Sequence, residues 1–200
     1  MLNSLKPADY YIREAHNYAM ILPEKYYGEG SYNEWIRVGW ALKNTDNRLF
    51  LSWVKFSSMA KNFNYSDIPE LHAMWINFDD ETTNTGLLTY RSIIYWAKQD
   101  SPKDKFKSVH DDTIDYFIEL TLPQPDQVKY SIVEFDLAMV LYQIFKDRFV
   151  CTNVTKNIWY EFKNHRWQEC DAGTSLRLEI SQDMYIIYTK KIQETLKLMV

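Results

Sequence analysis

Apolar residues recur along the first half of the chain with the spacing of amphipathic helices. The clearest case is the run 32–44, in which Trp35, Val38 and Leu42 fall at positions i, i+3 and i+7. This spacing places large apolar side chains on one side of a helix. We predict a central helix here, around which the core of the first half of the chain forms.

The start of this helix and one residue inside it carry further information. Ser31 followed by Glu34 has the pattern of a capping box, in which each side chain bonds a free backbone N–H of the other residue. Gly39 lies in the helix interior, where glycine costs about 1 kcal/mol relative to alanine. We therefore expect a neighbouring element to lie too close at Gly39 for a Cβ atom.

The rest of the first half repeats the helical pattern. Thr89 is the expected N-cap of the last of these helices, and the acidic, polar stretch 79–86 is expected to be a loop. The prediction for residues 1–99 is a helical domain of about five helices, at 7–22, 32–44, 49–57, 67–78 and 89–97.

The pattern changes after residue 99. Charged and helix-breaking residues predict a linker over 100–130 with one short helix, 112–120. A domain over 131–200 is expected to begin with a helix capped by Ser131 and Glu134, to continue with a small antiparallel β-meander, and to end with a helix capped by Thr174 or Ser175. The fold class is thus mainly α with a small α+β part. The last helix lacks a C-cap, which suggests that the chain is cut from a longer polypeptide.

Composition supports a globular chain. Of its 200 residues, 46% are hydrophobic and 16% aromatic, which is ample for a core. Cys151 and Cys170 form no CxxC pair, and no secretory signal or run of about 20 apolar residues is present. We expect a reduced, soluble, intracellular protein that needs no membrane.

Catalytic chemistry is not indicated. The acidic groups at 79–81 and at Asp111, Asp112 and Asp115 could be imagined to hold two metal ions, but they fall in an expected loop and at a helix start, so solvated charges are the favoured interpretation. The histidines and cysteines are too scattered for a zinc site. We expect no catalytic residue, no metal and no cofactor in this chain.

Single-stranded DNA is bound by aromatic rings that stack on bases and by cations that follow the phosphates. The net charge of −4 does not favour nucleic-acid binding, but residues 31–65 carry a local basic excess among aromatic residues. A packed core and a solvated surface would explain the same residues. The candidate DNA-contacting residues are Arg37, Lys43, Arg48, Lys55, Lys61, Lys156, Lys163, His165 and Arg166.

Two known families are similar to parts of this sequence. Residues 32–43, 50–54, 75–78 and 89–97 resemble the type-two primase C-terminal domain. Residues 140–149 and 159–167 resemble the start of the domain that precedes the superfamily 3 helicase in poxvirus-type primase-helicases of large DNA viruses.

The resemblance implies a connecting segment between a primase and a hexameric, ATP-dependent helicase. Its implied partners are the flanking primase and helicase domains, other copies in a hexamer, and single-stranded or forked DNA, at a replication site in the host cytoplasm. The chain has no phosphate-binding loop, because none of its five glycines is followed by the required Lys-Ser or Lys-Thr. The alternative is a protein-protein adaptor of the replication machinery that does not contact DNA.

Overall fold

The computed structural model describes residues 2, 5–78, 88–122 and 134–198. The chain divides into two compact units, Met1–Asp111 and Asp112–Val200, called the N-terminal and C-terminal units below. The domain boundaries expected after residues 99 and 130 stay predictions. The expected loop 79–86 and the expected cap at Ser131 lie outside the described residues.

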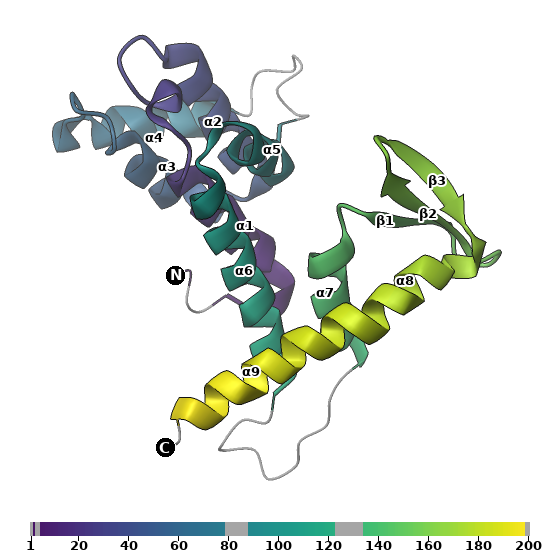
Figure 1. The fold of residues 1–200 in the computed structure, drawn as a ribbon. Helices are drawn as coiled ribbons and strands as arrows, with labels where there is room; N and C mark the ends of the chain where they lie inside the picture. Colours follow the sequence, from purple (N-terminus) through teal and green to yellow (C-terminus); the bar gives the residue numbers. More distant parts are fainter. Residues whose placement is uncertain (1, 3–4, 79–87, 123–133, 199–200) are drawn as a thin grey trace. The chain divides into compact units, whose positions relative to one another are not determined.

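The N-terminal unit is helical, and the five helices expected in it are confirmed. Tyr18, Leu42 and Trp53 from three of these helices are almost fully buried in one core, and α2 supplies much of that core, as the sequence predicts. The helices are α1 (Tyr10–Met20), α2 (Tyr32–Thr45), α3 (Phe50–Ser57), α4 (Ile68–Asn77) and α5 (Tyr90–Asp100) (Figure 1).

Gly39 lies where α2 meets the indole ring of Trp53 from α3. A Cβ atom at Gly39 would lie 2.8 Å from Cε2 and 2.9 Å from Nε1 of Trp53, and 3.1 Å from Cε2 of Phe78. Real Cβ atoms do not approach other atoms this closely. The close neighbour predicted from the sequence is therefore confirmed, and it is the Trp53 ring.

The two expected N-caps have different outcomes. Thr89 caps α5 as expected, because its side chain accepts a backbone hydrogen bond while Ser92 bonds back to the Thr89 N–H. The capping box at Ser31 is wrong: Ser31 precedes α2, but its hydroxyl donates to the backbone oxygen of Gly28 at 2.6 Å and caps nothing. The hydroxyl bonds backward into the preceding turn, so it is not available to the helix.

Asp100 joins the C-terminal end of α5 to the turn that precedes α2. The Nζ of Lys25 lies 2.7 Å from its Oδ1, and the Tyr26 hydroxyl donates to its Oδ2 at 2.6 Å. These two hydrogen bonds, that of Lys25 first, lower the pKa of the Asp100 carboxyl. A lowered pKa means that the stabilisation is complete above the unfolded-state pKa and is lost as the pH falls through the folded-state pKa.

We therefore expect Asp100→Asn to lower the free energy of unfolding of the N-terminal unit by about 1 kcal/mol at neutral pH and by much less in acid, once the pH has fallen below the lowered pKa of Asp100. Urea denaturation followed by circular dichroism at both pH values measures this difference. Asp104→Asn, at an exposed position on α6, is the control. An equal loss at both pH values would show that the ionised carboxylate is not what stabilises this junction.

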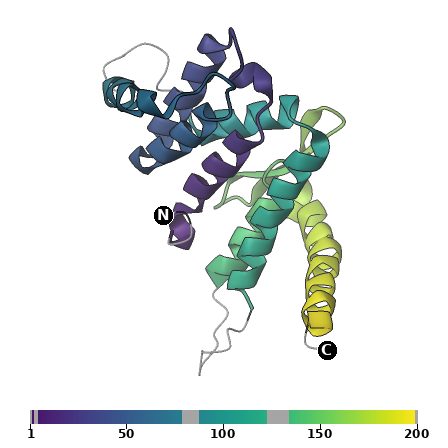
Figure 2. The same cartoon turned by 90° about the vertical axis from the view of Figure 1, so that its left-hand side faces the viewer.

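The short helix expected at 112–120 begins earlier than predicted. It is α6 (Lys103–Leu120), one uninterrupted helix in Figures 1 and 2, and the division between the two units falls within it. Phe106 stacks near Tyr18 of α1 with ring centroids 5.2 Å apart. The charged residues 103–105 thus belong to the exposed side of a helix, because Phe106 and Val109 pack against the core.

The C-terminal unit combines helices with a three-stranded antiparallel meander, which confirms the fold class. Phe145, Phe149 and Leu176 form a small buried cluster in it. The last helical stretch begins at Thr174 with Gly173 as its N-cap, so the expected side-chain cap at Thr174 or Ser175 is wrong. The elements are α7 (Glu134–Phe145), β1 (Phe149–Asn153), β2 (Ile158–Lys163), β3 (Arg166–Cys170), α8 (Thr174–Glu179), a π-helical segment (Ile180–Met184) and α9 (Tyr185–Leu198).

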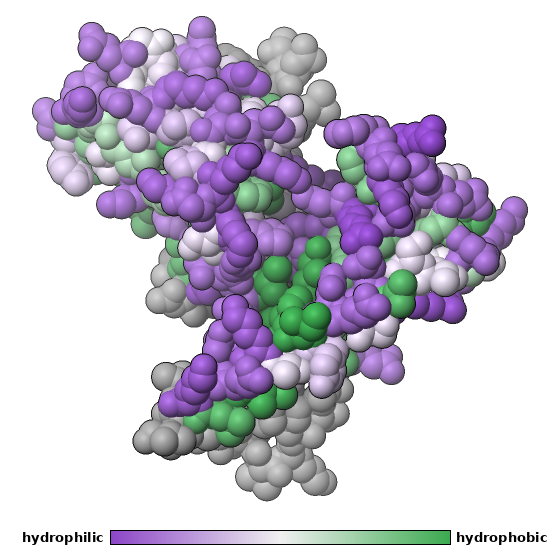
Figure 3. Space-filling model, in the orientation of Figure 1, coloured by the Kyte–Doolittle hydropathy of each residue, from purple (hydrophilic) through white to green (hydrophobic). Residues whose placement is uncertain are grey.

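Large apolar side chains remain exposed on the helices of the C-terminal unit. Figure 3 shows a hydrophobic patch near α7 and α9 on a face that is otherwise mostly hydrophilic. Exposed apolar clusters of this kind usually mark contact surfaces. The large apolar or aromatic side chains of this unit that are each more than half exposed include Phe135, Tyr142, Leu178, Tyr185, Ile186, Ile192 and Leu196. In the described part of the chain, no helix is both long and apolar enough to cross a membrane.

Candidate nucleic-acid interface

The three-stranded sheet carries the candidate interface, and a tight turn shapes its tip. Strands β2 and β3 are joined by Asn164 and His165, whose φ angles are 53° and 60°. Two successive residues with positive φ form the type I′ turn, whose twist matches that of a hairpin. His165 is an unusual choice here, because a side chain in the left-handed region costs about 1–2 kcal/mol. The turn holds an imidazole at the tip of the hairpin.

One face of this sheet is buried. Side chains alternate along a strand, so Phe149, Trp159 and Glu161 share a face. Phe149 and Glu161 are each 7% exposed, and Trp159 packs against the cluster formed with Leu176 of α8. Figure 1 shows α8 beside the strands. The sheet packs against the rest of the C-terminal unit through this face.

The opposite face of the sheet is open and aromatic. Tyr160 pairs with Val150 of β1, while Phe162 pairs with Trp167 of β3. The rings of Phe162 and Trp167 have centroids 5.3 Å apart, and the two residues are 42% and 48% exposed. An exposed aromatic pair on a rigid sheet offers two ring surfaces on which a planar ligand can stack.

The basic residues of the hairpin gather at its tip with one exception. Lys163 and Arg166 face each other across the two strands next to the turn, and both are exposed, as is His165. Lys156 lies in the turn between β1 and β2, at the opposite end of β2, which is about 17 Å long at 3.3 Å per residue. The structure thus gathers three of the four candidate residues of the hairpin at its tip, where alternation along the strands places Lys163 and Arg166 on the face opposite Phe162 and Trp167.

A partly exposed ionic cluster links the sheet to α8. Arg148, which precedes β1, donates from Nη2 to Glu161 Oε1 and to Glu179 Oε1, both at 2.7 Å. The Arg148 hydrogen bond lowers the pKa of Glu179, and burial together with the Glu179 carboxylate raises the pKa of Asp183. The charge of Lys163 also acts on Glu179. The orientation of the aromatic face therefore depends on Arg148.

The candidate cations of α2 do not share a surface. The Arg37 guanidinium lies 5.1 Å from the centre of the Trp96 ring of α5, whereas the Lys43 ammonium lies 5.6 Å from that of Trp75 of α4. Six residues of separation place the two about 120° apart around the helix. They point toward different neighbouring helices, so α2 offers no single basic stripe made of both.

The other three candidates of the N-terminal unit are also separate. Arg48 donates to Asp46 and to Asp9, which raises its pKa and links the segments before α3 and α1. Lys61 has its Nζ 3.8 Å from Glu24 Oε1, and Lys55 is exposed on α3. Arg48 already has carboxylate partners, so it is a structural residue here. DNA contact by any of these residues stays a prediction.

The described part of the chain holds no group of three or more His, Cys, Asp or Glu side chains placed to bind a metal ion. Asp111 pairs with Lys107 on the surface of α6, and Asp115 lies 3.6 Å from Lys191. Residues 79–81 lie outside the described residues. Asp111 and Asp115 therefore serve as surface ion-pair partners in this structure.

The cations of the hairpin were predicted from the sequence, but its exposed aromatic pair was not. Phe162 and Trp167 lie at equal distances from the turn residues Asn164 and His165. Since a two-residue turn makes such positions cross-strand partners, this symmetry was the available signal.

The fold and this surface define a class of protein with a helical domain followed by a small α+β unit that carries an exposed aromatic and basic hairpin. Comparison with known families then identifies the helical part. Residues 15–97 match the family model of Primase C terminal 2 (PriCT-2). The part of the earlier resemblance that concerns this domain is confirmed.

Similar proteins occur in large DNA viruses. The chain is 29% identical over 160 residues to a protein of Acanthamoeba polyphaga mimivirus named as a candidate helicase. It is 26% identical over 155 residues to a protein of African swine fever virus named as a candidate primase. These matches cover 80% and 75% of this chain but only 15% of each relative. The chain therefore resembles viral primase-helicase proteins and spans a small part of their length.

Proposed function

We propose that this chain is a connecting segment of a viral DNA-replication primase-helicase, which couples a primase to a hexameric superfamily 3 helicase that hydrolyses ATP. The match to a primase C-terminal domain and the similarity to much longer viral proteins support this placement. Tethering alone raises the effective concentration of one module near another to the millimolar range. In this proposal the flanking modules carry the chemistry, at a replication site in the host cytoplasm.

The exposed apolar side chains of α7 and α9 support the coupling role. Tyr185 is 70% exposed and Phe135 is 60% exposed, although neither belongs to an obvious ligand pocket. Side chains of this kind are usually covered in the complete protein. In the proposed assembly they pack against the flanking helicase module or against the neighbouring copy in the hexamer.

We further propose that the open face of the sheet guides single-stranded DNA. The observation that carries this proposal is the exposed Phe162–Trp167 pair on the open face, close to a hairpin tip at which Lys163, His165 and Arg166 are all exposed. Bases would stack on the two rings while the cations of the tip accompany the phosphates, a combination that binds single strands with little sequence preference. His165 adds a hydrogen-bond donor at the same tip.

Trp167→Ala is expected to weaken binding of labelled oligothymidylate about tenfold, because one stacking contact contributes about 1–3 kcal/mol. Fluorescence anisotropy across a series of salt concentrations measures the affinity. Arg166→Gln should in addition reduce the steepness of the salt dependence, since one phosphate contact is lost. Tyr185→Ala removes an aromatic ring of α9 that is 70% exposed, against 48% for Trp167, and serves as the control.

The alternative function is a protein-protein adaptor of the replication machinery that does not contact DNA, which the apolar surface of α7 and α9 favours. Affinity that does not respond to Trp167→Ala, or no binding at low salt, would remove the DNA-guiding proposal. Pull-down with the separately expressed helicase module then tests the adaptor, with Tyr185→Ala as the variant expected to reduce capture.

A further inference from the structure

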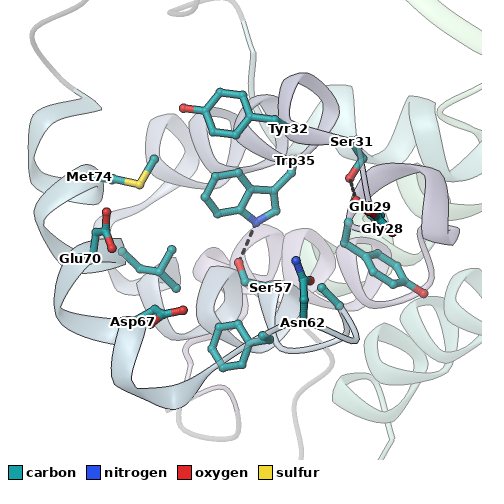
Figure 4. A pocket seen from close by; sticks show the side chains of 15 residues that line it. Gly28, Glu29, Ser31, Tyr32, Trp35, Ser57, Asn62, Asp67, Glu70 and Met74 are labelled. Carbon is teal, nitrogen blue, oxygen red and sulfur yellow. Dashed lines mark hydrogen bonds between the residues drawn. The ribbon is translucent and has the colours of Figure 1, made fainter.

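A pocket in the N-terminal unit lies apart from every candidate residue considered above. It has a volume of about 410 Å³ and lies between the turn before α2, the first turns of α2, the end of α3 and the start of α4. Figure 4 shows Trp35 at its centre with Tyr32 above it. Phe63, Leu71 and Met74 complete the apolar lining. A volume of this size admits one or two side chains of a partner, and no folded element.

The indole of Trp35 is held in place from behind. Its Nε1 donates to Ser57 Oγ at 2.8 Å, and its ring stacks on Trp53 with centroids 5.0 Å apart and an interplanar angle of 27°. Tyr32, which is 62% exposed, lies 5.7 Å away. The pocket therefore presents a pre-oriented aromatic surface, which binds a ligand without the entropic cost of ordering the ring.

The charge of the pocket has one sign. Asp67 and Glu70 stand together at the start of α4, on the same wall as Met74, and Glu29 lies on the opposite wall (Figure 4). None of the lining residues is Lys, Arg or His. The nearest cation in the sequence, Lys61, is directed toward Glu24, which does not line the pocket. Three carboxylates repel phosphate groups, so this pocket is unsuited to nucleic acid.

Aromatic rings beside carboxylates suit a cation that carries an apolar stem. A guanidinium can lie over an indole face while it donates hydrogen bonds to a carboxylate, and the methylene groups of an arginine fill apolar space. The apolar half of the pocket, at Leu71 and Met74, can accept a neighbouring aliphatic side chain. Both features are met by an arginine next to an apolar residue in an extended segment.

We propose that this pocket docks a basic segment of a partner protein, inserting an arginine side chain against Trp35 with its guanidinium at Asp67 and Glu70. The partner class follows from the charge and the aromatic surface together. This docking site is independent of the proposed DNA-guiding face, because the two lie in different units and select opposite charges.

The test uses the full chain labelled with ¹⁵N and two blocked hexapeptides of otherwise identical sequence, one with a central Leu-Arg and the other with a central Leu-Gln. The indole N–H resonance of Trp35 reports on the pocket, because that group is fixed by Ser57. The arginine peptide should shift this resonance in a saturable manner, and the affinity should fall as salt is added. The glutamine peptide should bind at least about fivefold more weakly.

Two variants complete the test. The double variant Asp67→Asn and Glu70→Gln should weaken the arginine peptide about fivefold to tenfold, while Asp104→Asn, at an exposed position on α6, should not change it. Unchanged resonances of the other indoles confirm that the variants fold. Equal binding of the two peptides, an unmoved Trp35 resonance, or shifts confined to another surface would overturn the proposal. Capture of oligothymidylate at this pocket would overturn it as well.

Discussion

Replacing Trp53 with alanine is expected to lower the free energy of unfolding of the N-terminal unit by about 3–5 kcal/mol. Trp53 is fully buried at the centre of an aromatic cluster, with ring centroids 5.0 Å from Trp35, 5.7 Å from Trp75 and 5.1 Å from Phe78. It also fills the space beside Gly39. Its removal leaves a cavity that rigid neighbouring rings cannot close.

Urea denaturation measures this loss, and hydrogen exchange of α2 and α3 assigns it to the N-terminal unit. Leu51→Ala is the matched control, since Leu51 lies on the same helix but is 64% exposed, and it should change the stability by less than about 0.5 kcal/mol. Trp53→Phe should lower the free energy of unfolding by less than Trp53→Ala does. Among the described residues, Trp53 Nε1 has no hydrogen-bond partner. A phenylalanine side chain at this position is therefore smaller than tryptophan but removes no hydrogen bond. A loss for Trp53→Ala as small as that of Leu51→Ala would contradict the central place given to this ring.

Replacing Arg148 with methionine is expected to destabilise the C-terminal unit by about 2–4 kcal/mol. Arg148 donates to Glu161 from Nε at 3.0 Å and from Nη2 at 2.7 Å, and the Glu161 side chain is only 10% exposed. Methionine keeps much of the volume but leaves the Glu161 carboxylate with no cation beside it. A nearly buried charge without its partner costs more than the lost hydrogen bonds themselves.

Hydrogen exchange of β1 and β2 measures this change within the C-terminal unit. Arg177→Met is the matched control, because Arg177 is exposed on α8. The double variant Arg148→Met and Glu161→Gln should recover part of the loss, since it removes the unpaired charge. If the double variant is no more stable than Arg148→Met, the loss comes from packing around Arg148 and not from the charge on Glu161.

The same substitution bears on the proposed function. Arg148 links Glu161 of the sheet to Glu179 of α8, and the opposite face, with Phe162 and Trp167, stays open. We expect Arg148→Met to weaken binding of single-stranded DNA only as far as it loosens the sheet. Trp167→Ala, in contrast, should weaken binding with little change in stability. The two variants therefore distinguish the stability of the sheet from the direct contact between its open face and DNA.

The helices of the N-terminal unit could be predicted because their determinants are local. The spacing of Trp35, Val38 and Leu42 and the cap at Thr89 operate within one or two helical turns. The interior Gly39 even indicated a close neighbour. The start of α6 was missed because Pro102 and the charged residues 103–105 indicated a linker, although Phe106 and Val109 already have the i, i+3 spacing of the helical face that packs on the core.

The strands of the hairpin could be predicted from the sequence, but which of their side chains are exposed could not. Aromatic and β-branched runs around Asn164 predicted the strands, and the basic residues near the turn were recognised. The sequence does not show that Trp167 is exposed while Trp159 packs against the core, because the strands that carry the two tryptophans have similar sequences. What separates them is which face of the sheet α8 covers.

By itself the sequence determined where the helices and strands form and which family the first part resembles, because backbone hydrogen bonding and side-chain periodicity act between residues close along the chain. The tertiary structure alone decided which cations lie side by side, which tryptophans are buried, and that Trp35 lines an acidic pocket. Those properties depend on partners far away in the sequence: Trp35 lies on Trp53 from another helix, and Asp67 and Glu70 come from a third. Burial and charge are set by such packing, which no local pattern records.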